Sequence, residues 1–148
     1  MREITYAEAA SEALREEFLR DDRTVHLSTD APLQLQKEFG PSRVRATPIS
    51  ETAFVGAAIG LAGSGFRPVV NIRMATFMFV AMDQFINQAA KITYMFGGQA
   101  RFPILYRVTI GAGMSMAAQH SINPYSIFMN IPGLKLIIPS TPYDMKGL

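Results

Sequence analysis

The chain contains no cysteine and no tryptophan, and acidic residues are scarce after its first 40 positions. Without cysteine, neither a disulfide framework nor thiolate chemistry is available, which is compatible with a reducing compartment. Uncharged runs occur, but none holds the roughly 20 apolar residues that a membrane span needs. The first residues also lack the apolar segment of a secretory signal. We therefore expect a soluble protein of the cytoplasm or of an organellar matrix.

Charge is unevenly distributed along the 148 residues. Nine of the 12 acidic residues lie in positions 1–40, whereas positions 41–148 hold nine of the 14 Lys and Arg residues. The formal net charge of +2 is too small to indicate nucleic-acid binding. The 49% share of apolar residues is enough for one domain with a real core. The pattern predicts an acidic surface helix followed by a basic, mostly apolar body.

Segments whose apolar residues have helical spacing alternate along the chain with segments that have the character of strands. A capping box, Thr5 with Glu8, opens an amphipathic helix over residues 5–20. Strands are expected over residues 24–28, 43–46, 67–72, 102–108 and 134–139. Helices that lead through Gly-rich turns into β-branched strands are typical of the α/β class. We therefore predict a parallel sheet with helices on both faces.

One carboxylate stands at the start of an apolar helix, in the stretch Thr47-Pro48-Ile49-Ser50-Glu51. Pro48 favours an extended residue before it, and Ser50 is a favourable N-cap. Residues 52–64 carry no charge, so we expect this helix to be buried nearly all round. Glu51 either complements the helix dipole or is a partly desolvated carboxylate that exchanges a proton with a ligand.

Residues 75–96 are expected to form one long helix with apolar residues on every side. Asp83 and Lys91 rule out a lipid span. A helix this apolar is hard to bury within one domain of this size, so we expect a second protein to cover it.

Both histidines and one glycine pair are further candidates for function. His26 follows a strand pattern, and we expect it to be structural or merely exposed. His120 is either a buried structural histidine or an acid–base group or ligand contact. Gly111-Ala112-Gly113 follows a strand, but Met116 stands at the third glycine position, so dinucleotide binding is disfavoured. The last helix, from Tyr143, is cut within two turns, which indicates a fragment of a longer protein.

Several blocks of residues together carry a specific resemblance. They are Thr47-Pro48-Ile49-Ser50-Glu51, Met82-Asp83-Gln84 with Asn87-Gln88-Ala89-Ala90-Lys91, Tyr94-Met95 with Gly97-Gly98-Gln99, Ala117-Ala118-Gln119-His120-Ser121, and Pro132-Gly133-Leu134-Lys135. In order and spacing the chain resembles the beta subunit of thiamine-diphosphate-dependent 2-oxo acid dehydrogenases, the pyruvate, acetoin and branched-chain enzymes. The resemblance covers essentially all of residues 1–148 and corresponds to the N-terminal pyrimidine-binding domain, which a transketolase-type C-terminal domain would follow.

The resemblance implies roles for individual residues in an oxidoreductase that decarboxylates 2-oxo acids. Glu51 matches the glutamate that bonds the aminopyrimidine ring of thiamine diphosphate and activates it for oxidative decarboxylation and acyl transfer. Phe77 matches an aromatic residue that packs on this ring, and Ile49 lies beside it. His120 matches an active-site histidine that assists substrate binding or proton transfer. Ile104 matches a residue whose carbonyl helps to hold a structural potassium ion in some members.

The resemblance also implies partners. An alpha subunit would hold the diphosphate and magnesium in a heterotetramer of two alpha and two beta subunits, and a lipoyl-bearing acyltransferase component would accept the acyl group. By this interpretation the isolated chain is inactive. The alternative, from another class, is a non-catalytic interaction module derived from this family that only binds a partner subunit.

The chain departs from the family's pattern in three places. Ser28-Thr29-Asp30 replaces a Gly-Glu-Asp sequence and runs almost directly to Leu33, where the family has a longer glycine-rich loop. The loop after Arg107 lacks the usual proline, and Asn71 stands where an acidic residue is common. The first departure lies near the implied entrance of the active site, so it bears on substrate choice and assembly.

Overall fold

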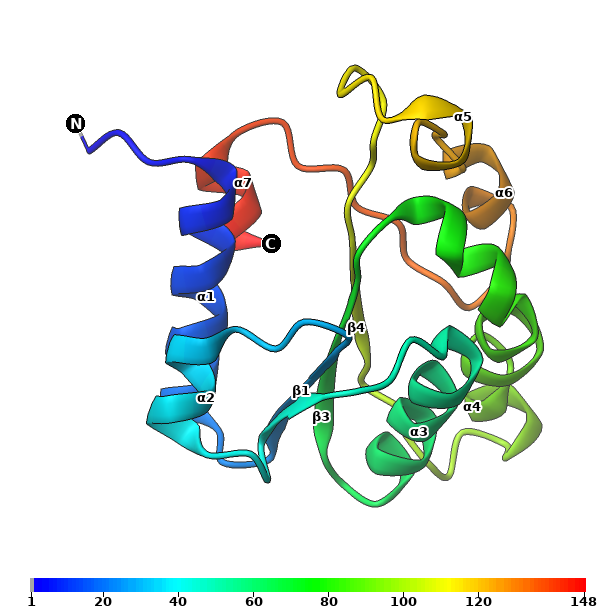
Figure 1. The fold of residues 1–148 in the computed structure, drawn as a ribbon. Helices are drawn as coiled ribbons and strands as arrows, with labels where there is room; N and C mark the ends of the chain where they lie inside the picture. Colours follow the sequence, from blue (N-terminus) through cyan, green and yellow to red (C-terminus); the bar gives the residue numbers. More distant parts are fainter. Residues whose placement is uncertain (1) are drawn as a thin grey trace.

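A computed structural model of the protein describes residues 2–148 and shows a parallel sheet between two layers of helices (Figure 1). The strands are β1 (Thr24–Ser28), β2 (Val44–Ala46), β3 (Arg67–Ile72) and β4 (Leu105–Val108). They lie in the order β2-β1-β3-β4, and each pairing is parallel. The expected α/β class is therefore confirmed. The strand predicted over residues 102–108 begins only at Leu105.

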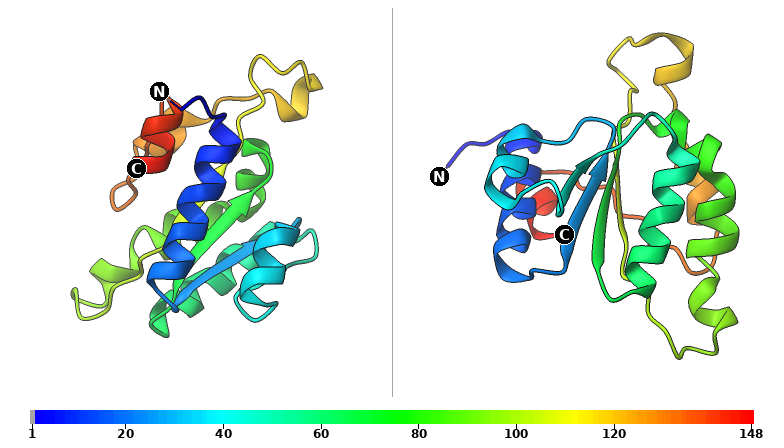
Figure 2. Two further views of the ribbon diagram at one scale, coloured as in Figure 1. Left: turned by 90° about the vertical axis from the view of Figure 1, so that its left-hand side faces the viewer. Right: turned by 60° about the horizontal axis from the view of Figure 1, so that its bottom comes forward.

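Helices α1 (Tyr6–Arg20), α2 (Leu33–Phe39) and α7 (Pro142–Gly147) form the layer on one face of the sheet (Figure 2). The capping box at the start of α1 is confirmed: Glu8 N donates to Thr5 Oγ1 at 3.2 Å, and Thr5 N donates to Glu8 Oε2 at 2.7 Å. Lys146 of α7 donates to Glu16 of α1 at 2.8 Å. A small core joins this layer to the sheet through Leu14, Phe18, Leu35 and Val44.

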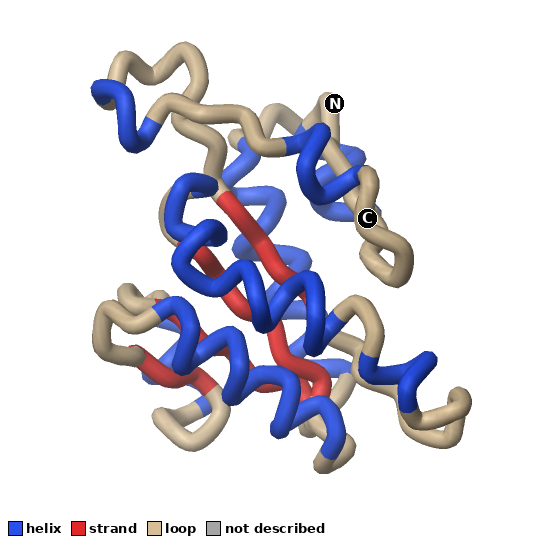
Figure 3. Tube along the Cα trace, turned by 90° about the vertical axis from the view of Figure 1, so that its right-hand side faces the viewer, coloured by secondary structure: helices blue, strands red, loops and turns tan. Residues whose placement is uncertain are grey.

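The opposite face of the sheet carries the larger core. Helix α3 (Glu51–Gly63) lies beside the segment from residue 75 to residue 95 in front of the strands (Figure 3). The buried residues of this core include Leu27, Phe54, Val55, Ala58, Val70, Ile72, Met78, Ala81, Phe85 and Phe128. The prediction that α3 is buried nearly all round is wrong, because Thr52, Ala53, Ala57 and Gly60 form an exposed face. These side chains are so small that an uncharged face is possible without a large apolar surface.

The prediction of one continuous helix over residues 75–96 is also wrong. The segment consists of the 3₁₀ helix η1 (Ala75–Ala81), the π-helix η2 (Gln84–Ala89) and the short helix α4 (Ile92–Met95). The three-residue period of η1 turns Ala75, Met78 and Ala81 towards the core. The Val80 carbonyl accepts the Thr52 hydroxyl of α3 at 2.7 Å, which ties the altered winding to the neighbouring helix.

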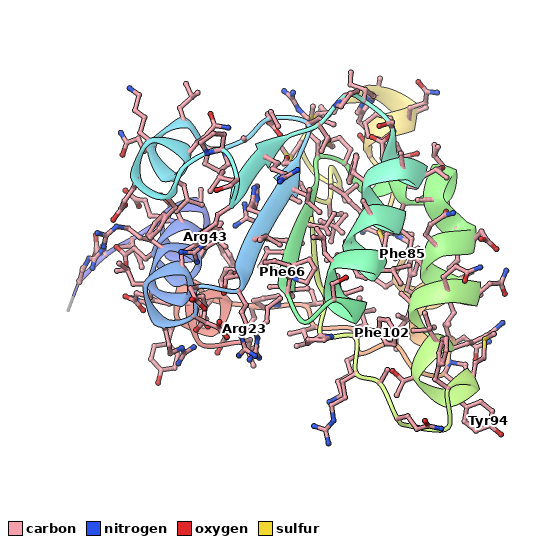
Figure 4. All side chains as sticks on the ribbon, turned by 90° about the horizontal axis from the view of Figure 1, so that it is seen from below. Arg23, Arg43, Phe66, Phe85, Tyr94 and Phe102 are labelled. Carbon is pink, nitrogen blue, oxygen red and sulfur yellow. The ribbon has the colours of Figure 1, made fainter. Side chains whose placement is uncertain are left out.

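Large apolar side chains on this segment remain exposed. Phe85 points into the core, whereas Tyr94 lies at the outer end of the layer with 90% of its surface exposed (Figure 4). Val80 and Met95 are also largely exposed. The exposed apolar surface thus agrees with expectation, and its coverage by a second protein stays a prediction.

The prediction of a strand over residues 134–139 is wrong as well. After α5 (Ala117–His120) and α6 (Tyr125–Met129) the chain has no regular structure until α7, and Ile137 and Ile138 are about half exposed. The segment crosses from the layer of α6 to the layer of α7 (Figure 1). Residues with a high strand propensity do not form a strand when the path of the chain leads them away from a neighbouring strand.

A cluster of polar side chains lies on the sheet face below α1 and α2. The Asn71 amide donates to Ser28 Oγ at 3.4 Å, and Arg107 Nε donates to Asn71 Oδ1 at 3.1 Å. Burial lowers the pKa of the Arg107 guanidinium. His26 lies on the same face of β1 as Ser28 and is 1% exposed, and neither of its ring nitrogens has a hydrogen-bond partner among residues 2–148.

Candidate functional site

A cleft of about 280 Å³ opens where β1, β3 and the start of α3 converge. It is lined by Thr29, Ile49, Glu51, Arg73 and Phe77. Thr29 directly follows β1 and Arg73 directly follows β3, so the cleft lies at the carboxyl ends of two neighbouring parallel strands. Open α/β sheets bind ligands at this edge. The structure therefore places Ile49, Glu51 and Phe77, three of the residues proposed from the sequence, around one hollow.

Glu51 occupies the first position of α3 and is 7% exposed. The loop before it is held at the end of the sheet because Thr47 N donates to the Ser28 carbonyl at 2.8 Å. The next turn buries Phe54 and Val55, which fixes the helix against the core. No hydrogen bond or ion pair within residues 2–148 satisfies the Glu51 carboxylate. The carboxylate lines the open cleft and is not sealed in the core, so it is available to a ligand.

Ser50 stands at the N-cap position but does not cap the helix with its side chain. Its hydroxyl donates to the Pro48 carbonyl at 3.1 Å, while Ala53 N and Phe54 N donate to the Ser50 carbonyl at 2.9 and 3.1 Å. The expected capping bond is therefore absent: the Ser50 hydroxyl is directed at the preceding Pro48 carbonyl and accepts no N–H of the first helical turn.

Two apolar side chains form walls of the cleft. Phe77 is half-buried in η1, where Phe77 N donates to the Met74 carbonyl at 3.0 Å and the buried Met74 and Met78 anchor the turn. Ile49 projects from the loop before α3 and is 86% exposed. An exposed isoleucine beside a carboxylate and an aromatic ring can pack on the face of a flat ligand.

His120, at the end of α5, does not line the cleft but contacts Phe77, which does. The two rings meet edge to face, with centroids 5.4 Å apart and planes at 87°. The absence of a side chain at Gly111 permits the close approach of the His120 backbone, since a Cβ at Gly111 would lie 1.5 Å from the His120 carbonyl oxygen. The turn between them contains Ser115 and Ala117 at φ values of 52° and 59°, a conformation that side chains disfavour.

Ile104 does not line the cleft. It precedes β4 and packs, partly buried, against the large core. Within residues 2–148 there is no group of three or more His, Asp or Glu side chains placed to hold a metal ion. In the same part of the chain no helix combines the length and apolarity required to cross a membrane.

Arg73 lines the cleft but was not identified from the sequence, and Thr29 was named only as part of the altered loop near the implied entrance of the active site. The signal that could have found them is their position: each is the first residue after a strand that was itself predicted. The carboxyl ends of parallel strands meet at one edge, so residues that follow neighbouring strands are candidates for one site.

Comparisons with known proteins match the whole of the described chain. The family described as "Transketolase, pyrimidine binding domain" matches residues 2–148. The Acetoin:2,6-dichlorophenolindophenol oxidoreductase subunit beta of Bacillus subtilis (strain 168) is 52% identical over 114 residues, which are 77% of this chain and 33% of that protein. The Pyruvate dehydrogenase E1 component subunit beta of Rickettsia bellii is 43% identical over 155 residues, covering 99% of this chain and 48% of that protein.

A third relative, the 2-oxoisovalerate dehydrogenase subunit beta of Bacillus subtilis (strain 168), is 40% identical over 157 residues, 100% of this chain and 48% of that protein. The chain thus spans about half of these relatives' length, or less. Among solved structures, one titled "Split gene transketolase, inactive beta4 tetramer" has the same fold, with a TM-score of 0.77. It is 19% identical, and the match covers 98% of this chain and 46% of that one.

Proposed function

Because the chain belongs to the transketolase pyrimidine-binding domain family, as its resemblance predicted, we propose that it acts as part of a beta-type subunit of a thiamine-diphosphate-dependent 2-oxo acid dehydrogenase. Its task is to supply the glutamate that activates the aminopyrimidine for oxidative decarboxylation and acyl transfer. One observation carries this proposal: Glu51 is buried at the edge of the cleft and has no partner among the described residues.

The residues of the cleft fit an aminopyrimidine ring. A flat heteroaromatic ring needs apolar contact on its faces and a polar group at its edge, and the cleft offers Ile49, Phe77 and one unpartnered carboxylate. Thiamine diphosphate, when bound, supplies the electron sink that decarboxylation of a 2-oxo acid requires and that side chains lack.

Glu51 is the acid–base group in this proposal. Its carboxylate, which lines the cleft and is 7% exposed, passes a proton to and from a nitrogen of the ring. Ile49 and Phe77 orient the ring so that the proton is transferred at one defined atom. His120, in contact with Phe77, assists substrate binding or a later proton transfer.

The remaining parts of the site belong to partners in this proposal. The alpha subunit holds the diphosphate and magnesium in a two-alpha, two-beta assembly, and a lipoyl-bearing acyltransferase component receives the acyl group. The exposed Val80, Tyr94 and Met95 support a covering partner, since large apolar side chains exposed along one segment favour an interface. The Ile104 carbonyl is proposed to contribute to a potassium site. We place the complex in the cytoplasm or an organellar matrix.

Reconstitution tests the proposal. The protein that contains this chain is mixed with its alpha-type partner, thiamine diphosphate and magnesium, and oxidation of pyruvate or 2-oxoisovalerate is followed with an artificial electron acceptor. We expect turnover by the complex and none by residues 1–148 alone. A complex that forms and binds the cofactor but oxidises neither substrate would contradict the enzymatic proposal and favour the interaction module.

A further inference from the structure

Arg73 is the cationic side chain that lines the cleft, and the role proposed for the site does not use it. It follows the buried Ile72 at the carboxyl end of β3, so its backbone is fixed by the sheet while 69% of its side chain is exposed. A guanidinium at the mouth of a ligand cleft is a candidate for anion recognition, because it presents several N–H donors in one plane.

The contacts of Arg73 leave its guanidinium available. Its ion pair within residues 2–148 is with Asp30, at 3.9 Å, and the Asp30 side chain is 54% exposed. Asp30 is itself oriented by Ser28, whose hydroxyl donates to Asp30 Oδ1 at 2.9 Å. An exposed pair at this distance contributes little to stability and is readily exchanged for a better partner. Asp30 therefore leaves the Arg73 guanidinium free to exchange this contact for an anionic ligand.

The negative charge of Glu51 opposes the binding of an anionic ligand in the same cleft, and a cation beside it would counter this effect. No ion pair joins Arg73 to Glu51 among the described residues, so both charges face the cleft separately. A ligand that carries a carboxylate would be repelled by Glu51, whereas a neutral ligand would not. Arg73 offsets this repulsion, and its guanidinium N–H groups can donate to both carboxylate oxygens.

We infer that Arg73 binds the carboxylate of the substrate and makes the site favour 2-oxo acids over neutral acyl donors such as acetoin. This inference rests on the proposed function and names a residue that determines its specificity. Arg73 acts on the substrate, and the proton transfer by Glu51 to the cofactor ring does not depend on it.

The first test compares variants in the reconstituted complex. Arg73→Gln removes the charge, Arg73→Lys keeps the charge but loses the fork, and Arg67→Gln is the matched control at the other end of β3. We expect Arg73→Gln to raise KM for pyruvate by about 10- to 100-fold with little change in kcat, the range of a charged hydrogen bond. The KM of Arg73→Lys for pyruvate should lie between those of the parent and Arg73→Gln, and the KM of Arg67→Gln should match that of the parent.

Proton exchange at the cofactor's thiazolium carbon, measured without substrate, separates this role from a structural one. Arg73→Gln should leave the exchange rate unchanged. An exchange rate that falls together with turnover, or a KM for pyruvate that does not rise, would overturn the inference. Where acetoin is also turned over, its KM should stay within about threefold of the parent, because a neutral donor forms no charged contact with Arg73.

A binding measurement keeps the inference testable even if the complex oxidises no substrate, an outcome that would contradict the proposed function alone. The Nε–Hε resonance of Arg73 is followed in the reconstituted complex, in which the subunit that contains this chain is ¹⁵N-labelled, during titration with pyruvate and, separately, with its uncharged methyl ester. A saturable shift with pyruvate that is absent with the ester supports carboxylate binding. Equal responses to both compounds, or none to pyruvate, refute it.

Discussion

His26 makes the stability of the fold sensitive to mild acid. Its imidazole is 1% exposed on the sheet face opposite the large core, and neither ring nitrogen has a partner among residues 2–148. Burial and, secondarily, the charge of Arg107 lower its pKa from 6.5 to about 4, although Asp30 opposes the shift. The neutral ring is therefore the form that the folded state accommodates.

The direction and size of the effect follow from this pKa. The unfolded chain takes up a proton near pH 6.5 and the folded chain only near pH 4, so the free energy of unfolding falls as the pH falls between these values. The full loss is roughly 3 kcal/mol, of which about 2 kcal/mol is expressed between pH 7.5 and pH 5.0. This is a large fraction of the stability of an ordinary domain.

Above pH 5 the change in stability that His26 causes can be measured apart from the changes that carboxylates cause. The pKa of Asp21 is held far below its usual range, chiefly by its bonds to Arg23, and the pKa of Glu38 is lowered by Arg15. Depressed carboxylate pKa values give stability that is lost only as the pH falls below the ordinary values near 4. A loss of stability between pH 7.5 and pH 5.0 therefore reports on histidine.

Urea denaturation followed by circular dichroism at pH 7.5, 6.5 and 5.0 measures the effect. The parent should lose about 2 kcal/mol over this range, and His26→Leu should lose far less, because it has no imidazole to protonate. At pH 7.5 the leucine variant should be at least as stable as the parent, since no hydrogen bond is removed. His120→Leu keeps His26 and should retain the parent's loss. An equal loss in the parent and in His26→Leu would refute this reasoning.

Two further predictions concern close backbone contacts. Gly111→Ala would place a Cβ 1.5 Å from the His120 carbonyl, so we expect turnover of the reconstituted complex to fall at least tenfold while circular dichroism stays near that of the parent; full activity would show that this contact does not position His120. Gly133→Ala, at φ +97° and 2.0 Å from the Ala90 carbonyl, should lower the free energy of unfolding by about 1–3 kcal/mol, more than the control Gly98→Ala, which has a positive φ but open space; equal losses in denaturant titrations would contradict the steric argument.

The parallel sheet was predictable because its signals are local. β1 and β3 are short β-branched runs, each followed by polar residues or a turn, and the strand of residues 44–46 leads directly into the loop before Glu51. Residues 134–139 have a similar composition, but the chain crosses between layers there and offers no partner strand. That course is set by tertiary packing, which a local pattern does not contain.

The winding of residues 75–96 could not be predicted for a different reason. Over residues 75–82 nearly every side chain is apolar, so no face of a helix differs from another and the period of the pattern is lost. Phe85 shows the consequence, since it is fully buried in a π-helix that the composition does not distinguish from an α-helix. The altered winding nevertheless decides where Phe77 stands in the cleft.

The candidate site was predictable only in part. Glu51 was identifiable from its position at the start of an uncharged helix and His120 was a candidate as a histidine, whereas the roles of Ile49 and Phe77 came from the resemblance. The contact between Phe77 and His120 joins residues 43 positions apart, which no local pattern reveals. Arg73 was not identified, because a charged residue just after a strand has the composition of an ordinary loop.

The central claim is that the Glu51 carboxylate transfers the proton that activates the cofactor. The most direct measurement is hydrogen–deuterium exchange at the thiazolium carbon of thiamine diphosphate bound to the reconstituted complex, in the parent and in Glu51→Gln. The substitution is nearly isosteric and removes a helix-dipole interaction of only about 0.3–1 kcal/mol, so the complex should still assemble and bind the cofactor. We expect exchange at least about 100-fold slower in Glu51→Gln, since an amide cannot transfer the proton. Exchange as fast as in the parent would contradict the account.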